Sequence, residues 1–209
     1  KGSPLSIPVE IHWDLFNTKN PLEKYAFRIN TEEFWNSIEP VAVGTETGQV
    51  MSPENQVIYL CCHLLKESYA DEKWTKDIDL VVRYYQDRID WQELASRAAR
   101  YKVRKTVWFA LSYVNRFYGT RLPENLMESL GQTGPGSYER HIMQRLFRNK
   151  RIGRLRLLGL YLSAIETPID RARALLGVGP YIVRRSAMMK RKFHFPEACR
   201  NPHERESSH

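Results

Sequence analysis

A chain of 209 residues, 42% of them apolar and 27% charged, is long enough for one large or two small domains around a packed core. No uninterrupted apolar run approaches the ~20 residues that a membrane helix needs, so the composition excludes a membrane span. No apolar segment follows the first five residues, so no secretory signal is visible. Three cysteines without metal-ligand spacing favour a reducing, cytoplasmic location.

The net charge of +8 is unevenly distributed. Residues 138–194 contain 14 lysines and arginines against three acids, a local charge of +11. Such a region attracts polyanions, which include nucleic acid, nucleotides and anionic membrane surfaces. The alternative is a set of solvated helix faces without a specific partner.

Alternating side chains in residues 6–16 predict a β-strand. One side carries apolar residues and the other carries ionisable ones, because successive strand side chains point to opposite faces. The two sets are Val9, Ile11 and Trp13 against Glu10, His12 and Asp14. This pattern fits a half-buried strand whose polar face meets water, and it also fits a strand that presents a metal-binding carboxylate at Glu10.

The next segment predicts short elements. Residues 17–21 form a turn, and residues 25–29 alternate weakly enough to be a strand or an irregular segment. A short helix begins at Thr31, and Pro40 ends it. Residues 41–44 and 49–51 then flank a predicted small hairpin or irregular loop over residues 45–48.

Residues 52–131 are nearly all helical by apolar periodicity. Ser52 is placed to cap the first helix, with Pro53 at its first position, and Asp90 starts another with Glu93 at the capping-box position. Three further expected helices cover about residues 72–87, 103–118 and 123–131. The helix over 103–118 is the most apolar, so we expect it at the centre of the bundle.

Glycine and proline make residues 132–137 the clearest linker in the chain. Beyond it the periodicity predicts helices near residues 138–149, 153–165, 169–176 and 180–193, with a break at residues 177–180. The fold class is therefore α+β, a short N-terminal strand region followed by a mainly α-helical bundle. The expected divisions are residues 1–51, 52–131, a basic helical extension over 132–195 and a disordered tail over 196–209.

Four segments, in this order, resemble the uncharacterised nucleotidyltransferase family of the DNA polymerase β-like superfamily. They are an acid-x-His-Trp strand at Glu10, a helix with His63 and Lys66, a helix with Asp77, and an Asp-Trp helix start at Asp90. The resemblance covers residues 7–130.

The resemblance implies transfer of a nucleotide from an NTP by a site in which three carboxylates hold two Mg²⁺ ions. It implies that Glu10 is the third of these acids, a metal ligand and catalytic residue. A Gly-Ser turn and an Asp-x-Asp pair complete the family's site, and we expect them upstream of Lys1. A chain that lacks them would be inactive by itself.

Asp77 and Asp79 reproduce the Asp-x-Asp letters, but they occur in a helical pattern. Carboxylates at i and i+2 of a helix point away from each other, so we interpret them as helix residues and not as a metal pair.

Four further residues are candidates for nucleotide contact. The resemblance places Lys66 near a phosphate and pairs Asp77 with His63 or Lys66 at a cleft, while His12 shares the strand face of Glu10. A structural ion pair or hydrogen bond that joins two helices is the alternative, and it is the interpretation that we favour for His63, Lys66 and Asp77.

A non-catalytic helical module is the alternative function. Its basic C-terminal helices would bind nucleic acid or an acidic partner, with Tyr181, Phe193 and Phe195 available for stacking. A Ser or Cys nucleophile has little support, because Cys61 and Cys62 occupy an apolar helix and suit core packing. The acceptor, the preferred nucleotide and the oligomeric state are not encoded in any motif.

Overall fold

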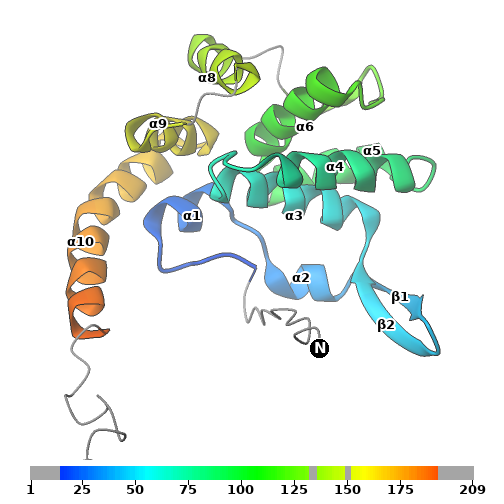
Figure 1. Cartoon of the computed structure of the whole chain (residues 1–209), viewed down its shortest axis with the longest axis horizontal. Helices are drawn as coiled ribbons and strands as arrows, with labels where there is room; N and C mark the ends of the chain where they lie inside the picture. Colours follow the sequence, from blue (N-terminus) through cyan, green and yellow to red (C-terminus); the bar gives the residue numbers. More distant parts are fainter. Residues whose placement is uncertain (1–14, 132–135, 149–151, 193–209) are drawn as a thin grey trace, which may run out of the picture.

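The computed structural model describes residues 15–131, 136–148 and 152–192, with side chains as far as Arg184. This part of the chain is mostly helical, with ten helices and one two-stranded antiparallel sheet, which confirms the α+β class. The predicted strand over residues 6–16 lies almost entirely outside the described residues, as does the tail over 196–209. Helices α3 to α5 form a middle layer, with α6 on one side and α1 and α2 on the other (Figure 1).

Two short helices open the described chain: α1 (Pro21–Ala26) and α2 (Thr31–Trp35). Each has an asparagine cap, since the side chains of Asn20 and Asn30 accept hydrogen bonds from backbone N–H groups in the first turn. The strand considered for residues 25–29 is absent, because the Asn-Pro helix start takes Tyr25 and Ala26 into α1.

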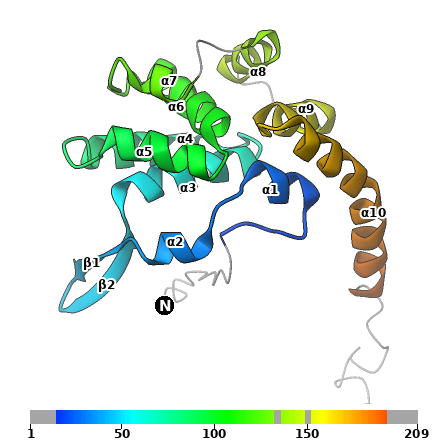
Figure 2. The same ribbon diagram turned by 180° about the vertical axis from the view of Figure 1, so that it is seen from behind.

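Of the two alternatives for this segment the hairpin is correct, but its turn comes earlier than predicted, because residues 46–48 belong to its second strand. Strands β1 (Ile38–Val43) and β2 (Glu46–Met51) pair antiparallel and turn at Gly44, whose φ of +62° suits glycine. Pro40 lies inside β1 and does not end a helix, since α2 already stops at Trp35. The hairpin extends from the body at the end opposite α10 (Figure 2).

The bundle consists of α3 (Pro53–Lys66), α4 (Glu72–Tyr84), α5 (Trp91–Arg100) and α6 (Arg104–Tyr118). The apolar stripes predicted from periodicity form its core, and Gly119 ends α6 with a left-handed φ of +66°. Fully buried members include Val57, Cys61, Leu64, Ile78, Leu94, Val107, Leu111 and Val114.

The C-terminal helices are α7 (Leu126–Ser129), α8 (Ser137–Phe147), α9 (Arg154–Ala164) and α10 (Pro168–Lys192). The break predicted at residues 177–180 was wrong, because α10 runs through it as one helix of 25 residues with Pro180 inside. Gly177 allows α10 to pack on α1, since a Cβ there would lie 2.9 Å from Pro21. Tertiary contact thus outweighs the local cost of glycine.

Two acids attach the C-terminal helices to the rest. Asp170 is buried and forms an ion pair with Arg28, and its other carboxylate oxygen accepts a hydrogen bond from the Thr167 hydroxyl. Glu166 pairs with Arg104 at the start of α6 at 3.0 Å. The segment between α1 and α2 and the start of α10 are therefore in contact although they are far apart in the sequence. Figure 1 shows α1 and α10 as neighbours.

Candidate functional site

Two of the predicted site residues, Glu10 and His12, lie outside the described residues. The described chain begins immediately after them. Phe16 is buried there, with its ring centroid 4.7 Å from that of Phe27 and 5.8 Å from that of Tyr59 on α3. Phe16 is thus anchored on Tyr59, the residue of α3 that also stacks on His63.

His63 lies within an aromatic cluster between α3 and α4. Its ring stacks on Tyr59 at 5.6 Å and meets Trp74 edge-on at 4.4 Å. Its Nε2 is 4.0 Å from the Glu67 carboxylate one turn later. Burial raises the pKa of Tyr59, and the nearby Glu67 carboxylate raises it further. The Tyr59 phenol therefore remains a neutral hydrogen-bonding group at physiological pH.

A groove of about 400 Å³ opens beside this cluster, between the end of β2, α3 and α4. We call it the α3–α4 groove. Its lining residues are Met51, Gln56, Tyr59, Leu60, Asp77, Leu80 and Val81. Most of these side chains are apolar, and Asp77 provides the only carboxylate among them. A mainly apolar wall with a few polar groups is typical of a small-molecule site.

Tyr59 links the predicted residues, because it stacks on His63 and also lines the groove with Asp77. Lys66 is half-buried in the last turn of α3. Within the described part of the chain, neither Lys66 nor Asp77 forms an ion pair. His63 and Asp77 are therefore gathered around one aromatic residue instead of being paired with each other.

The two aspartates of the Asp-x-Asp sequence point to different surroundings. Asp77 lines the groove, whereas Asp79 is buried and accepts hydrogen bonds from Thr120 and from Arg83 Nε, the latter at 2.7 Å. Among the described residues, no group of three or more His, Cys, Asp or Glu side chains is placed to hold a metal ion. The described residues alone therefore do not provide the carboxylates that a pair of metal ions needs.

Glu54 of α3 and the motif residue Asp90 hold α3 and α5 together. The Glu54 carboxylate accepts a hydrogen bond from the Asp90 backbone N–H at 3.0 Å, and the Asp90 side chain caps α5. Arg97 donates to Ser52 Oγ at 2.9 Å. Ser52 is the N-cap residue of α3, as predicted, but its hydroxyl makes no capping hydrogen bond and accepts from Arg97 instead. Glu93 lies at the predicted position in α5, but its carboxylate pairs with Arg97 and Arg100.

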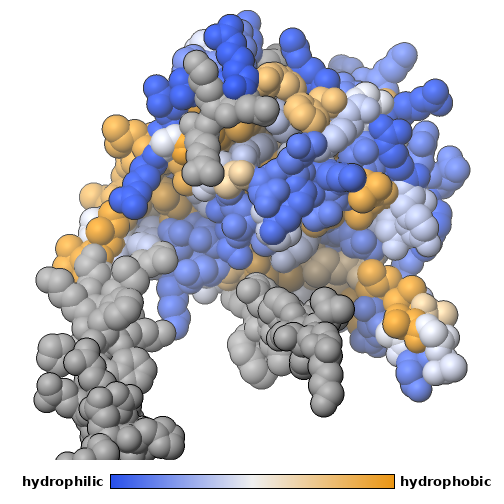
Figure 3. Space-filling view, viewed as in Figure 1, coloured by the Kyte–Doolittle hydropathy of each residue, from blue (hydrophilic) through white to orange (hydrophobic). Residues whose placement is uncertain are grey.

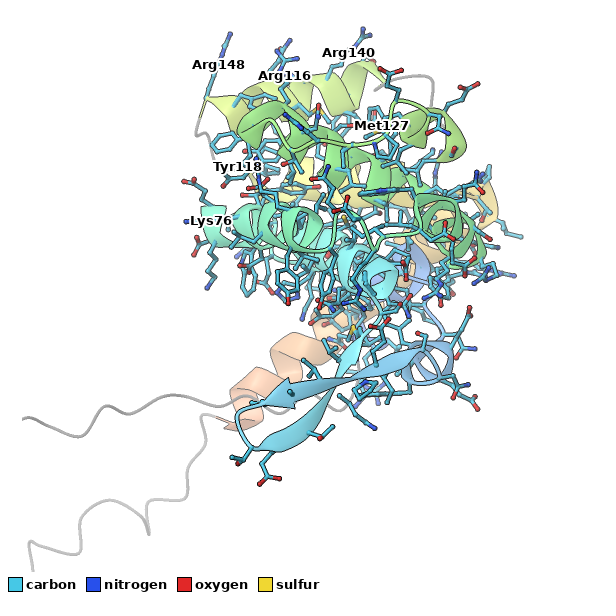
Figure 4. All side chains as sticks on the ribbon, turned by 90° about the vertical axis from the view of Figure 1, so that its right-hand side faces the viewer. Lys76, Arg116, Tyr118, Met127, Arg140 and Arg148 are labelled. Atoms are coloured by element: carbon cyan, nitrogen blue, oxygen red, sulfur yellow. The ribbon has the colours of Figure 1, made fainter. Side chains whose placement is uncertain are left out.

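A second surface combines cations with stacked rings. The rings of Phe117 on α6 and Phe147 on α8 lie parallel at 6.4 Å, and Arg116 lies 5.1 Å above Phe147. Figure 4 shows Arg116, Arg140 and Arg148 projecting from α6 and α8 along one edge of the molecule. We call this surface the α6–α8 ridge. Phe193 and Phe195, expected to stack, lie outside the described residues, and Tyr181 is half-buried.

Phe16 and Glu67 are two residues of this region that were not predicted from the sequence. Glu67 follows His63 by four residues, a spacing that places two side chains together on a helix, so this contact was predictable. Phe16 gave no such signal, since its contacts come from distant segments. Cys61 and Cys62 are fully buried, and burial raises the pKa of both thiols, which leaves them as core residues and not nucleophiles.

Comparison with known proteins gives one match. A family model described as "Uncharacterised nucleotidyltransferase" matches residues 4–119, more than half of the chain. No curated protein and no solved structure was found to match. The matched residues include the aromatic cluster, the α3–α4 groove and the contacts between α3 and α5. No helix in the described part of the chain is sufficiently long and apolar to cross a membrane.

Proposed function

The chain belongs to the uncharacterised nucleotidyltransferase family, and from this premise we propose that it takes part in Mg²⁺-dependent transfer of NMP from an NTP. An acceptor hydroxyl attacks the α-phosphorus, a new P–O bond forms, and the α–β anhydride bond breaks to release pyrophosphate. The hydroxyl proton passes to solvent. Mg²⁺ supplies charge neutralisation on the phosphates when it is bound. In this proposal the site is of the polymerase β-like kind, and Glu10 is one of its carboxylates.

The single observation that supports this proposal best is the anchoring of Phe16 on Tyr59 beside the groove. Glu10 precedes Phe16 by six residues, and an extended chain covers at most ~3.6 Å per residue, so their Cα atoms are within about 22 Å. Chain connectivity alone therefore limits how far this acid can lie from the aromatic cluster to which Phe16 belongs.

The groove suits the base and ribose of a nucleotide. Leu60, Leu80 and Val81 offer an apolar wall for a base, while the Asp77 carboxylate can accept hydrogen bonds from ribose hydroxyls or a base amino group. Lys66 follows Tyr59 by two helical turns on the same side, where its ammonium group can reach phosphate oxygens. His63 positions Tyr59 by stacking.

The first test measures NMP transfer from Mg-NTP with the full-length protein. We expect Glu10→Ala to abolish transfer, because a remaining pair of acids holds the metals poorly. Glu46→Ala, which removes an exposed carboxylate from β2, is the matched control and should leave the rate unchanged. Full activity in Glu10→Ala would contradict the proposal.

A second measurement tests the groove by nucleotide binding. We expect Asp77→Ala to weaken binding about tenfold, the effect of a lost charged hydrogen bond. Asp87→Ala, an exposed aspartate just beyond α4, is the control. Equal affinities for the two variants would remove the groove from the nucleotide site.

The α6–α8 ridge favours a second candidate, the binding of nucleic acid by a non-catalytic module. Its stacked Phe117 and Phe147 with Arg116 above them are suited to bases and phosphates. This binding would fall steeply as salt rises and would be insensitive to Glu10→Ala and to chelator. Mg-dependent nucleotide binding would instead be weakened by Glu10→Ala and by chelator, and it would depend less on salt.

A further inference from the structure

Helix α10 exposes large apolar side chains along much of its length. Five of them are between 50% and 78% exposed, in a helix where an apolar stripe normally faces the core. They are Ile169, Leu175, Leu176, Ile182 and Val183. We call this set the α10 apolar face. Figure 3 shows hydrophobic side chains along this helix at the edge of the molecule.

The α10 apolar face is turned away from the protein. Residues 169, 176 and 183 are seven apart, as are 175 and 182, so at 100° per residue all five lie within one arc of about 140°. The opposite side meets the body, where Ala174 and Asp170 are buried and Gly177 lies against Pro21 of α1. The helix is thus amphipathic with its apolar side toward solvent.

Cations border the α10 apolar face on both sides. At the same 100° spacing, Arg171 falls next to Ile182 on one edge, and Arg173 and Arg184 fall beyond Ile169 on the other. Arg173 and Arg184 are exposed. The helix then continues through Arg185, Lys190, Arg191 and Lys192 in the sequence. The one acid in the helix is Asp170, which is buried against Arg28.

We propose that α10 binds along an anionic lipid surface, with its apolar face at the boundary between headgroups and acyl chains. Apolar side chains flanked by arginines on a helix of low net hydrophobicity are the features of an interfacial helix. Acidic headgroups provide the counter-charge that the helix itself lacks. A second copy of α10 would bring arginines against arginines at both edges, which disfavours pairing of two such faces.

The test is co-sedimentation of the full chain with vesicles of phosphatidylcholine alone or of phosphatidylcholine with phosphatidylglycerol. We expect binding to the anionic vesicles that weakens with salt. Val183→Glu should lower the partition coefficient about tenfold or more, because it removes apolar contact and adds a repelled charge. Arg184→Gln should lower it about fivefold on anionic vesicles.

Val43→Glu is the matched control, because Val43 of β1 is an exposed valine far from α10 and the substitution changes the charge equally. It should bind as the unsubstituted chain does. Circular dichroism should show unchanged helicity for Val183→Glu, since the side chain is 71% exposed.

Three results would overturn the proposal. The first is no binding to anionic vesicles, or binding that Val183→Glu leaves intact. The second is a lipid-free dimer that Val183→Glu dissociates, which would assign the face to a second copy. The third is nucleic-acid binding that Val183→Glu abolishes. None of these depends on Glu10, so the proposed transferase function can fail separately.

Discussion

The family-matched region and the C-terminal helices differ in whether their cationic side chains have partners within the fold. Around α3 and α5, Arg97 contacts Glu93, Glu54 and Ser52, so its charge is partnered inside the fold. In α8 to α10 arginines greatly outnumber acids, and Glu166 and Asp170 are both engaged by arginines of the matched region. Most C-terminal cations therefore remain available to an external partner.

Apolar side chains differ between the two regions in the same way. The stripes of α3 to α6 meet in a shared core, whereas the α10 apolar face meets solvent. A region that partners its own groups is built for stability, and one that exposes both charge and apolar area is built for contact with something else. Four predictions test this contrast.

The largest expected effect compares two arginines. Arg97→Ala leaves the buried Glu54 carboxylate without its cation and should lower the free energy of unfolding by about 3 kcal/mol. Arg184→Ala removes an exposed cation from α10 and should change it by less than about 0.5 kcal/mol. Urea denaturation measures both. Similar losses for the two variants would contradict the contrast.

The junction between the regions should be sensitive to Asp170. Asp170→Asn weakens the contacts with Arg28 and Arg173 and should cost about 2 kcal/mol, because charged hydrogen bonds are replaced by neutral ones. The substitution should increase the rate of amide hydrogen exchange more in α10 than in α3. Asp87→Asn is the control at an exposed site, and unchanged exchange in α10 would show that the ion pair does not hold this helix.

The boundary also contains a cavity of about 280 Å³ lined by residues from α3, α6, α8 and α9. Thr106 lies in its wall with a buried hydroxyl that has no hydrogen-bond partner among the described residues. Thr106→Val should therefore stabilise the chain by about 1 kcal/mol. Thr120→Val is the control of opposite sign, since the Thr120 hydroxyl donates to Asp79. A melting temperature that falls in both variants would contradict the expected stabilisation by Thr106→Val.

The smallest effect concerns pH. The hydrogen bond from Arg97 lowers the pKa of Glu93 below its ordinary 4.5. A pKa that is lower in the folded state stabilises the fold above the unfolded pKa, and this stability is lost as pH falls through the folded value. Glu93→Gln should cost about 0.5 kcal/mol at neutral pH. In denaturation at acidic pH the loss should disappear, and a loss that persists there would exclude the charge as its cause.

Much of this fold follows from local sequence. The helix starts at Asn30 and Asp90 and the end of α6 at Gly119 lie where a capping side chain or the φ of glycine favours them. The divergence of Asp77 and Asp79 also followed from helical spacing alone. These features depend on interactions within a few residues, which is why periodicity and capping signals reveal them.

Contacts between distant segments decided the rest. Gly177 and Pro180 signal a break, yet packing against Pro21 keeps α10 continuous. Ser52 signals a cap, yet Arg97, 45 residues later, takes its hydroxyl. Periodicity reveals that α10 has an apolar side, but only the position of α1 decides that this side faces outward, because a helix can rotate about its axis without any change in its sequence pattern.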